Sequence, residues 1–209
     1  MSPRQDVSEE RKSQIMDAAI NVFARQGFHQ ARMDDIAEEA GLSKGALYLY
    51  YKSKDAVVGA IFTFIFSQLM KRVNAFVAAD DGGSVRDKLL KLNRYFAIEM
   101  RWMLSSLTPI LFEFYAVAAR QKDVRQSLKE YFQEYRTALA TLIRRGIEQG
   151  EFRPVDPEAV AITHTALYEG LALLTVVDPQ GLDWERAGDT SLRLLLDGLA
   201  VRSPDHPDQ

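Results

Sequence analysis

The chain has 209 residues, 47% hydrophobic and 26% charged, with a formal net charge of −3, which is typical of a soluble globular protein. It has no cysteine, three histidines and no glycine-rich phosphate loop, so disulfides and thiolate metal sites are excluded, and we expect no enzymatic activity, metal or cofactor. No uninterrupted apolar run approaches about 18 residues, and the polar N-terminus lacks the apolar segment of a signal peptide; we expect a cytoplasmic protein without a membrane-spanning helix.

Helical periodicity extends along nearly the whole chain and predicts an all-α fold of about nine helices. The first helix is expected at 8–27, where acidic residues fill the first turn and a glycine marks the end. Its apolar face consists of Ile15, Ala18, Ala19, Val22 and Phe23.

Residues 32–54, RMDDIAEEAGLSKGALYLYYKSK, predict two short helices joined by a glycine turn. Ile36, Ala37 and Ala40 share one face of the first helix. Gly41 can adopt the positive φ that ends a helix, and Ser43 is a good N-cap for a second helix that runs to about residue 50. This pattern is typical of helix-turn-helix proteins, which place the second helix in the major groove of DNA.

The composition of the second helix also suits DNA. Small residues at its start let the backbone approach closely, and lysine and tyrosine side chains can contact phosphates. Residues 40–54 contain three lysines and no acid, although 1–54 as a whole has eight basic and eight acidic residues. An ordinary corner of an all-α core is the alternative for each element taken singly. The candidate DNA-binding residues are Arg32, Ser43, Lys44, Gly45, Ala46, Tyr48, Leu49, Tyr50, Tyr51, Lys52 and Lys54.

Residues 11–62, with IMDAAINVFARQGF and MDDIAEEAGLSKGALYLYYKSKDAVVGAIF, resemble the N-terminal domain of the TetR family of bacterial transcriptional regulators over nearly every position. Tyr51 stands where the family usually has Phe. Arg32 stands where it often has Thr; arginine cannot cap the helix but can reach a phosphate or a base edge. Residues 112–152 resemble, less specifically, the C-terminal domain of the BetI-like branch.

The resemblance agrees with the helices expected beyond the motif. They span 53–78, 84–106, 109 onward, 123–149, 157–177 and 183–201, with a turn signal at 178–181. We therefore expect a helix-turn-helix domain at 1–52, a helical effector-binding and dimerisation domain at 53–203 and a disordered tail at 204–209.

The last two predicted helices are apolar on more than one face, so each is expected to be buried on more than one side. Burial within one chain is one explanation. Pairing with the same helices of a second chain is the one we favour, because helix-turn-helix proteins commonly bind two half-sites. The candidate interface residues are Ala166, Gly170, Leu174, Leu192, Leu195, Leu196 and Leu199.

An effector pocket in the larger domain is a further expectation, since aromatic residues and methionine line pockets for apolar ligands. The same residues also fill ordinary cores. The candidates are Trp102, Met103, Phe112, Glu113, Tyr115, His164 and Tyr168.

These features predict a ligand-responsive regulator, most simply a repressor. A homodimer would bind a palindromic operator in double-stranded DNA and be released by a small lipophilic molecule. The alternative is a DNA-binding regulator controlled by a protein partner, or an activator, without a small-molecule effector.

Overall fold

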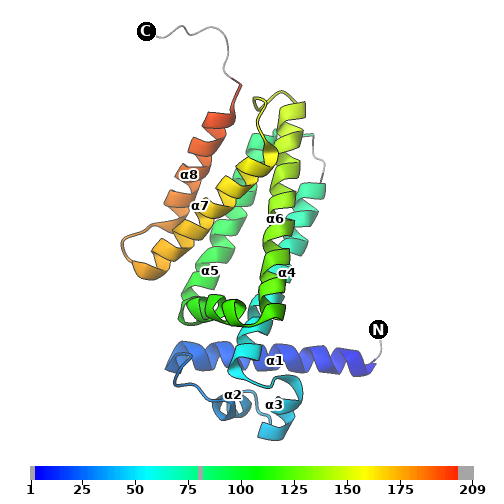
Figure 1. Cartoon of the computed structure of the whole chain (residues 1–209), viewed down its shortest axis with the longest axis vertical. Coiled ribbons are helices and arrows are strands. Elements are labelled where there is room, and N and C mark those ends of the chain that lie inside the picture. Colours follow the sequence, from blue (N-terminus) through cyan, green and yellow to red (C-terminus); the bar gives the residue numbers. More distant parts are fainter. Residues whose placement is uncertain (1–2, 80–81, 202–209) are drawn as a thin grey trace. The chain divides into compact units, whose positions relative to one another are not determined.

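The computed structural model describes residues 3–79 and 82–201, and these fold almost entirely into helices (Figure 1). The all-α prediction is confirmed: among the described residues, extended backbone pairs only at an isolated bridge between Phe152 and Ala200. The predicted disordered tail, 204–209, lies outside the described residues. The helices are α1 (Pro3–Gln26), α2 (Met33–Glu39), α3 (Lys44–Tyr50), α4 (Lys54–Ala78), α5 (Val85–Arg120), α6 (Lys122–Glu148), α7 (Pro157–Val177) and α8 (Trp184–Leu199).

Two predicted helix boundaries differ from the structure. Helix α1 begins at Pro3, five residues before the predicted start at residue 8. The sequence favoured a helix at 84–106 and another beginning at Pro109, but both segments belong to the continuous helix α5. Proline lacks an N–H and crowds the preceding turn, so local sequence favours a break at this position. The structure instead keeps the helix continuous through Pro109, in agreement with the apolar pattern on both sides of it.

Side chains just before three other helices cap their starts. Ser53 accepts a hydrogen bond from the backbone N–H of Ala56 at 3.2 Å and so caps α4. Asp156 and Asp183 do the same for α7 and α8. These local signals explain why the ends of α4 and α7 lie where the sequence placed them.

The described residues form two compact units, and α4, α5 and α6 each contribute to both. The first comprises Met1–Gln68 and Ser105–Glu130, and the second comprises Leu69–Leu104 and Tyr131–Gln209. The first unit therefore contains the motif and extends beyond the predicted domain 1–52.

The core of the first unit joins the motif to α4, α5 and α6. The rings of Phe62 and Phe114 stack with centroids 4.2 Å apart, and Asp55 accepts a hydrogen bond from Arg120 at 3.1 Å. Helices α4 and α6 approach very closely at Gly59, where an added Cβ would lie 2.9 Å from Cγ2 of Val124. Glycine is therefore required for this helix contact.

The second unit is built around a large aliphatic core. Leu142, Leu192 and Leu196 are almost completely buried in it, and Phe96 and Tyr135 add an edge-to-face aromatic pair with centroids 5.6 Å apart. The core cluster also includes Met70, Val73, Leu89, Leu139 and Ile143.

Helices α4 and α7 are each long and apolar enough to cross a membrane. The core helix of a soluble protein meets the same criterion, and α4 supplies several buried residues of both units. The burial of these residues accounts for the apolar character of α4.

Glu151 links the end of α6 to the start of α5. Its carboxylate accepts hydrogen bonds from the Ser84 hydroxyl at 2.8 Å and from the backbone N–H groups of Val85 and Arg86 at 2.8 and 3.1 Å. Partial burial opposes the charged form, but the two backbone hydrogen bonds and the serine hydroxyl outweigh it and lower the pKa of Glu151. A residue distant in sequence thus caps α5.

Replacing this carboxylate tests the cap. Glu151→Gln should lower the free energy of unfolding by about 1 kcal/mol at neutral pH, the usual cost of a lost N-cap. Because the pKa of Glu151 is lowered in the folded state, the extra stability that it gives over Gln is complete above pH 4.5, the ordinary pKa of a glutamate. It should disappear as the pH falls through the folded-state pKa.

Urea unfolding over this pH range measures the effect, with Glu148→Gln on the exposed end of α6 as the control. A difference that stays constant with pH would rule out the capping role.

Candidate functional site

Helices α2 and α3 form the compact corner that the sequence predicted, and both lie on the same side of α1 (Figure 1). The backbone reverses at Gly41, whose φ is +63°, and the N–H of Leu42 donates to the carbonyl of Ala37 at 2.8 Å. The hydroxyl of Ser43 then accepts a hydrogen bond from the N–H of Ala46 at 3.2 Å. The predicted turn and N-cap are therefore confirmed.

Helix α3 is fixed from one side only. Leu47 is completely buried and anchors it beside Ile36 of α2. On the other side Ser43, Lys44 and Gly45 are exposed at the start of α3, and Leu49 is 78% exposed. An exposed leucine on a short anchored helix can contact the methyl group of thymine in the major groove.

The positive charges at this face have partners that phosphate could replace. Lys44 donates to Asp34 at 2.9 Å, and this hydrogen bond and the charge of Asp34 raise the pKa of Lys44. Lys52 donates to the carbonyl of Tyr48 at 2.5 Å. Because both contacts are exposed to solvent and weak, DNA phosphates can replace them at little cost. Arg32 is exposed at the start of α2, where Asp35 accepts its backbone N–H at 2.8 Å.

The structure separates Tyr51 and Lys54 from this exposed set. Tyr51 is only 8% exposed, and burial raises the pKa of its hydroxyl. The ammonium of Lys54 donates to the carbonyl of Phe28 at 2.5 Å and lies 4.5 Å from the centre of the Phe28 ring. Both side chains hold α3 and α4 against the rest of the unit. Of the tyrosines in the predicted set, Tyr48 and Tyr50 are the half-buried ones that remain at the surface.

The predicted effector residues are divided between the two units. Phe112 and Tyr115 are exposed in the first unit, and there Glu113 pairs with His29 at 3.0 Å. Met103, His164 and Tyr168 belong to the second unit. The side chain of Trp102 lies outside the described residues.

His164 and Tyr168 are the centre of a polar cluster inside the second unit. Their rings stack with centroids 4.5 Å apart, and the Tyr168 hydroxyl donates to Asn93 Oδ1. His164 is 8% exposed, and its Nδ1 has no hydrogen-bond partner among the described residues. Burial lowers the pKa of His164 to about 4, so the ring is neutral at pH 7.

Three small cavities surround this cluster. The largest, about 40 Å³, is lined in part by Phe96, Tyr135, Tyr168 and Glu169. Each of the other two has a volume of about 10 Å³ and includes His164 in its wall. Sequence inspection missed Asn93, which lies between Lys91 and Arg94 in a mixed segment, and Tyr135, which lies on the apolar face of α6.

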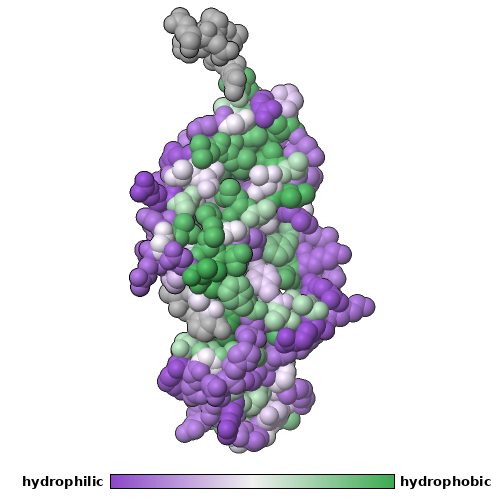
Figure 2. Space-filling model, turned by 60° about the vertical axis from the view of Figure 1, so that its left-hand side comes forward, coloured by the Kyte–Doolittle hydropathy of each residue, from purple (hydrophilic) through white to green (hydrophobic). Residues whose placement is uncertain are grey.

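Helix α7 carries much of the exposed apolar surface of the second unit, and Figure 2 shows apolar side chains gathered on this side of the molecule. Leu174 and Ala166 of the predicted interface are exposed, and Gly170 and Leu195 are half-buried. Ile162, Leu173 and Val177 of α7 and Leu194 of α8 are also exposed.

The remaining predicted interface residues lie elsewhere. Leu192, Leu196 and Leu199 belong to the core cluster of their own chain, because α8 turns this face toward α5 and α6. A row of leucines on a helix does not reveal from sequence alone which of them faces a partner.

Comparison with known proteins gives two family matches and several full-length relatives. Residues 15–61 match the family described as bacterial regulatory proteins, tetR family. Residues 105–200 match the family described as BetI-type transcriptional repressor, C-terminal. The chain is 30% identical over 162 residues to the HTH-type transcriptional regulator YfiR of Bacillus subtilis, covering 76% of this chain and 77% of YfiR. It is 26% identical to the HTH-type transcriptional regulator TtgR of Pseudomonas putida, covering 93% of this chain and 96% of TtgR.

Solved structures show the same fold. A TetR transcription regulator from Haloarcula marismortui superposes with a TM-score of 0.80 at 19% identity, over 92% of this chain and all of that one. The Thermus thermophilus repressor FadR, solved in complex with lauroyl-CoA, superposes with a TM-score of 0.65 at 25% identity, over 95% of this chain and all of that one.

The buried histidine generates a prediction about acid stability. Below pH 6.5 an unfolded chain protonates this residue, whereas the folded protein, with a pKa of about 4, does not. Wild-type protein should therefore lose stability as the pH falls from 6.5 to 4, by about 1.4 kcal/mol for each unit by which the pKa is lowered. His164→Leu should remove this part of the acid sensitivity.

Chemical unfolding of wild type and His164→Leu between pH 6.5 and 4 measures this loss of stability. The control is His29→Gln, at an exposed histidine. Equal acid sensitivity of wild type and His164→Leu would contradict the assigned burial.

Proposed function

Because the chain belongs to the TetR family of bacterial transcriptional regulators, we propose that it is a ligand-responsive repressor in the cytoplasm. A homodimer places α3 of each protomer in successive major grooves of a palindromic operator. A small lipophilic molecule that binds in the second unit releases the DNA.

The observation that carries this proposal is the one-sided anchoring of α3. Leu47 holds the helix, while Ser43, Lys44 and Leu49 remain exposed on its other side. The N-terminus of α3 offers free backbone N–H groups and the positive end of the helix dipole to phosphate. The exposed side chains supply one cation and one apolar contact, which suits a protein that binds selected sequences rather than DNA in general.

Exposed apolar surface on α7 supports the homodimer. Leu174 is 55% exposed and Val177 is 70% exposed, and large apolar patches on soluble proteins mark interaction sites. A second copy of the chain offers the same surface, so a twofold arrangement buries both patches at once.

The polar cluster of the second unit supports an effector site. The unpaired Nδ1 of His164 is costly to bury, and a ligand with a hydrogen-bond donor would satisfy it. The related Thermus thermophilus FadR is solved with lauroyl-CoA, which favours a ligand with a long apolar part. Release of DNA requires that the ligand bind one of the two protein states more tightly than the other.

The size of the cavities favours a second candidate function. About 40 Å³ holds roughly one water molecule and no lipophilic effector. A regulator controlled by a protein partner, or an activator without a small-molecule effector, needs no cavity large enough for a lipophilic molecule. The effector proposal therefore requires that α7 or α8 move to enlarge the site when a ligand binds.

Lys44 provides a test of the DNA-binding mode. Lys44→Ala should weaken binding to an operator selected from random DNA and reduce the salt dependence by about one counterion for each bound protomer. The slope of log affinity against log salt concentration measures this directly. Lys91→Ala, at an exposed lysine of the second unit, is the matched control. An unchanged slope for Lys44→Ala would exclude a phosphate contact.

The dimer is tested by charging its proposed interface. Leu174→Glu should convert the protein to a monomer at micromolar concentration, because two carboxylates would be buried close to the twofold axis without partners. Sedimentation velocity measures the oligomeric state. Ile98→Glu on α5, where the natural side chain is 60% exposed, is the control and should leave the dimer intact. A monomeric wild type, or a dimeric Leu174→Glu variant, would refute the α7 interface.

A further inference from the structure

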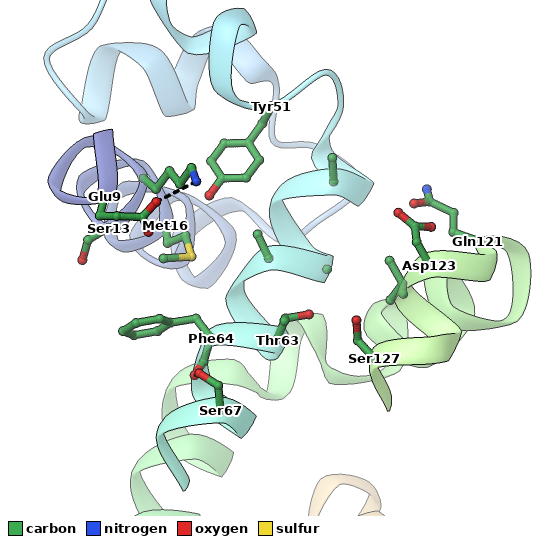
Figure 3. Close-up of a pocket in the computed structure, with 15 residues that line it drawn as sticks. Glu9, Ser13, Met16, Tyr51, Thr63, Phe64, Ser67, Gln121, Asp123 and Ser127 are labelled. Carbon is green, nitrogen blue, oxygen red and sulfur yellow. Dashed lines mark hydrogen bonds and ion pairs between the residues drawn. The ribbon is translucent and has the colours of Figure 1, made fainter. Parts of the chain in front are cut away.

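The first unit contains a groove of about 450 Å³ between α1, α4 and α6 (Figure 3). We call it the α1–α4–α6 groove. All of its lining residues belong to the first unit. The groove is therefore separate from the effector cavities described above, which are lined by residues of the second unit. Its volume lies within the range of sites that bind small organic molecules, about 300–1,000 Å³. Its lining includes Met16 of α1, Tyr51 after α3, Thr63 and Phe64 of α4, and Asp123 and Ser127 of α6.

The groove has an apolar floor. Ala56 and Ala60 present only methyl groups along α4, and these small side chains leave the space open beside the close contact of Gly59 with Val124. Met16 from α1 and the ring of Phe64, which is 47% exposed, lie toward one end (Figure 3). An alkyl chain or a thin aromatic group would remove this apolar surface from water, which favours binding.

Hydroxyl groups line the groove above this floor. The hydroxyls of Ser13, Tyr51, Thr63 and Ser127 make no hydrogen bond to another described residue, whereas Ser67 donates to the carbonyl of Phe64 at 2.7 Å. Figure 3 shows the Tyr51 hydroxyl directed toward the groove from the loop that follows α3. A mostly apolar surface with a few polar groups is the usual composition of a ligand site.

The charges favour a cation. Glu9 and Lys12 pair at 2.8 Å and cancel one another. Asp123 has no cationic partner among the ion pairs of the described residues, so the groove carries one uncompensated negative charge. It lies at the α6 end, across the groove from Met16 and Phe64 (Figure 3). The acidic end and the apolar end together match a molecule with a positive head and an apolar tail.

We propose that the α1–α4–α6 groove is a second ligand site, which binds an amphipathic cation with its ammonium group at Asp123 and its tail at Met16 and Phe64. The occupant would also touch Tyr51, which caps the C-terminus of α3 by donating its backbone N–H to the carbonyl of Leu47 at 3.0 Å. The site therefore adjoins the end of the helix that faces DNA. It stands independently of the effector cavities in the second unit.

Cysteine protection tests the site, because the natural chain has no cysteine. Thr63→Cys places a single thiol in the groove, and Thr137→Cys places one on the exposed part of α6 outside it. Dodecyltrimethylammonium, below its micelle concentration, should slow maleimide labelling at position 63 severalfold and leave position 137 unchanged. Equal rates at position 63 with and without the cation, or equal protection at both positions, would overturn the proposal.

The charge preference is tested with a matched neutral molecule, dodecyl maltoside. The cation should bind about twofold to fivefold more tightly than the neutral chain, the size expected of one exposed ion pair. Asp123→Asn should abolish this preference without preventing binding of the neutral chain. Ala60→Phe, which fills the floor, should abolish protection by both molecules while circular dichroism shows a folded protein. A preference that survives Asp123→Asn, or protection that survives Ala60→Phe, would contradict the assigned pose.

Discussion

The burial of Leu47 is the constraint on which the DNA-binding surface depends. Helix α3 has only seven residues, too few to be stable alone, so its structure and orientation come from packing this side chain against α2 and the core. Once that side is buried, the helix can present only its other side to solvent. The turn at Gly41 and the cap at Ser43 fix the direction in which that side points. Loss of any one of these contacts would leave a helix without a defined orientation.

Local chemistry made much of this surface predictable, while tertiary packing made the rest unpredictable. A glycine with positive φ and a serine N-cap act within a few residues, so Gly41 and Ser43 were found from sequence. The partners of Lys54 lie about 26 residues away in the chain, and its role as an internal anchor was invisible. Tyr51 looked like its neighbours but is buried. For the same reason the leucines of α8 could not be divided between core and surface, and Asn93 drew attention only once its contact with Tyr168 was known.

Two features of the structure bear on how such a regulator could be controlled. The second unit holds a neutral buried histidine beside cavities too small for a lipophilic molecule. The first unit instead holds an open groove next to the end of α3. A ligand in the second unit must create its own space, whereas a ligand in the groove would touch Tyr51 directly. The two sites differ in chemistry, since one offers an unpaired imidazole nitrogen and the other an unpaired carboxylate.

The central claim is that α3 of each protomer enters the major groove of DNA. Methylation interference on a selected operator tests it most directly, because the N7 atom of guanine lies in the major groove. The account predicts that methylation blocks binding at two clusters of guanines about 34 Å apart, related by twofold symmetry. Interference confined to minor-groove positions, or to a single cluster, would contradict the placement of α3 and the dimer together.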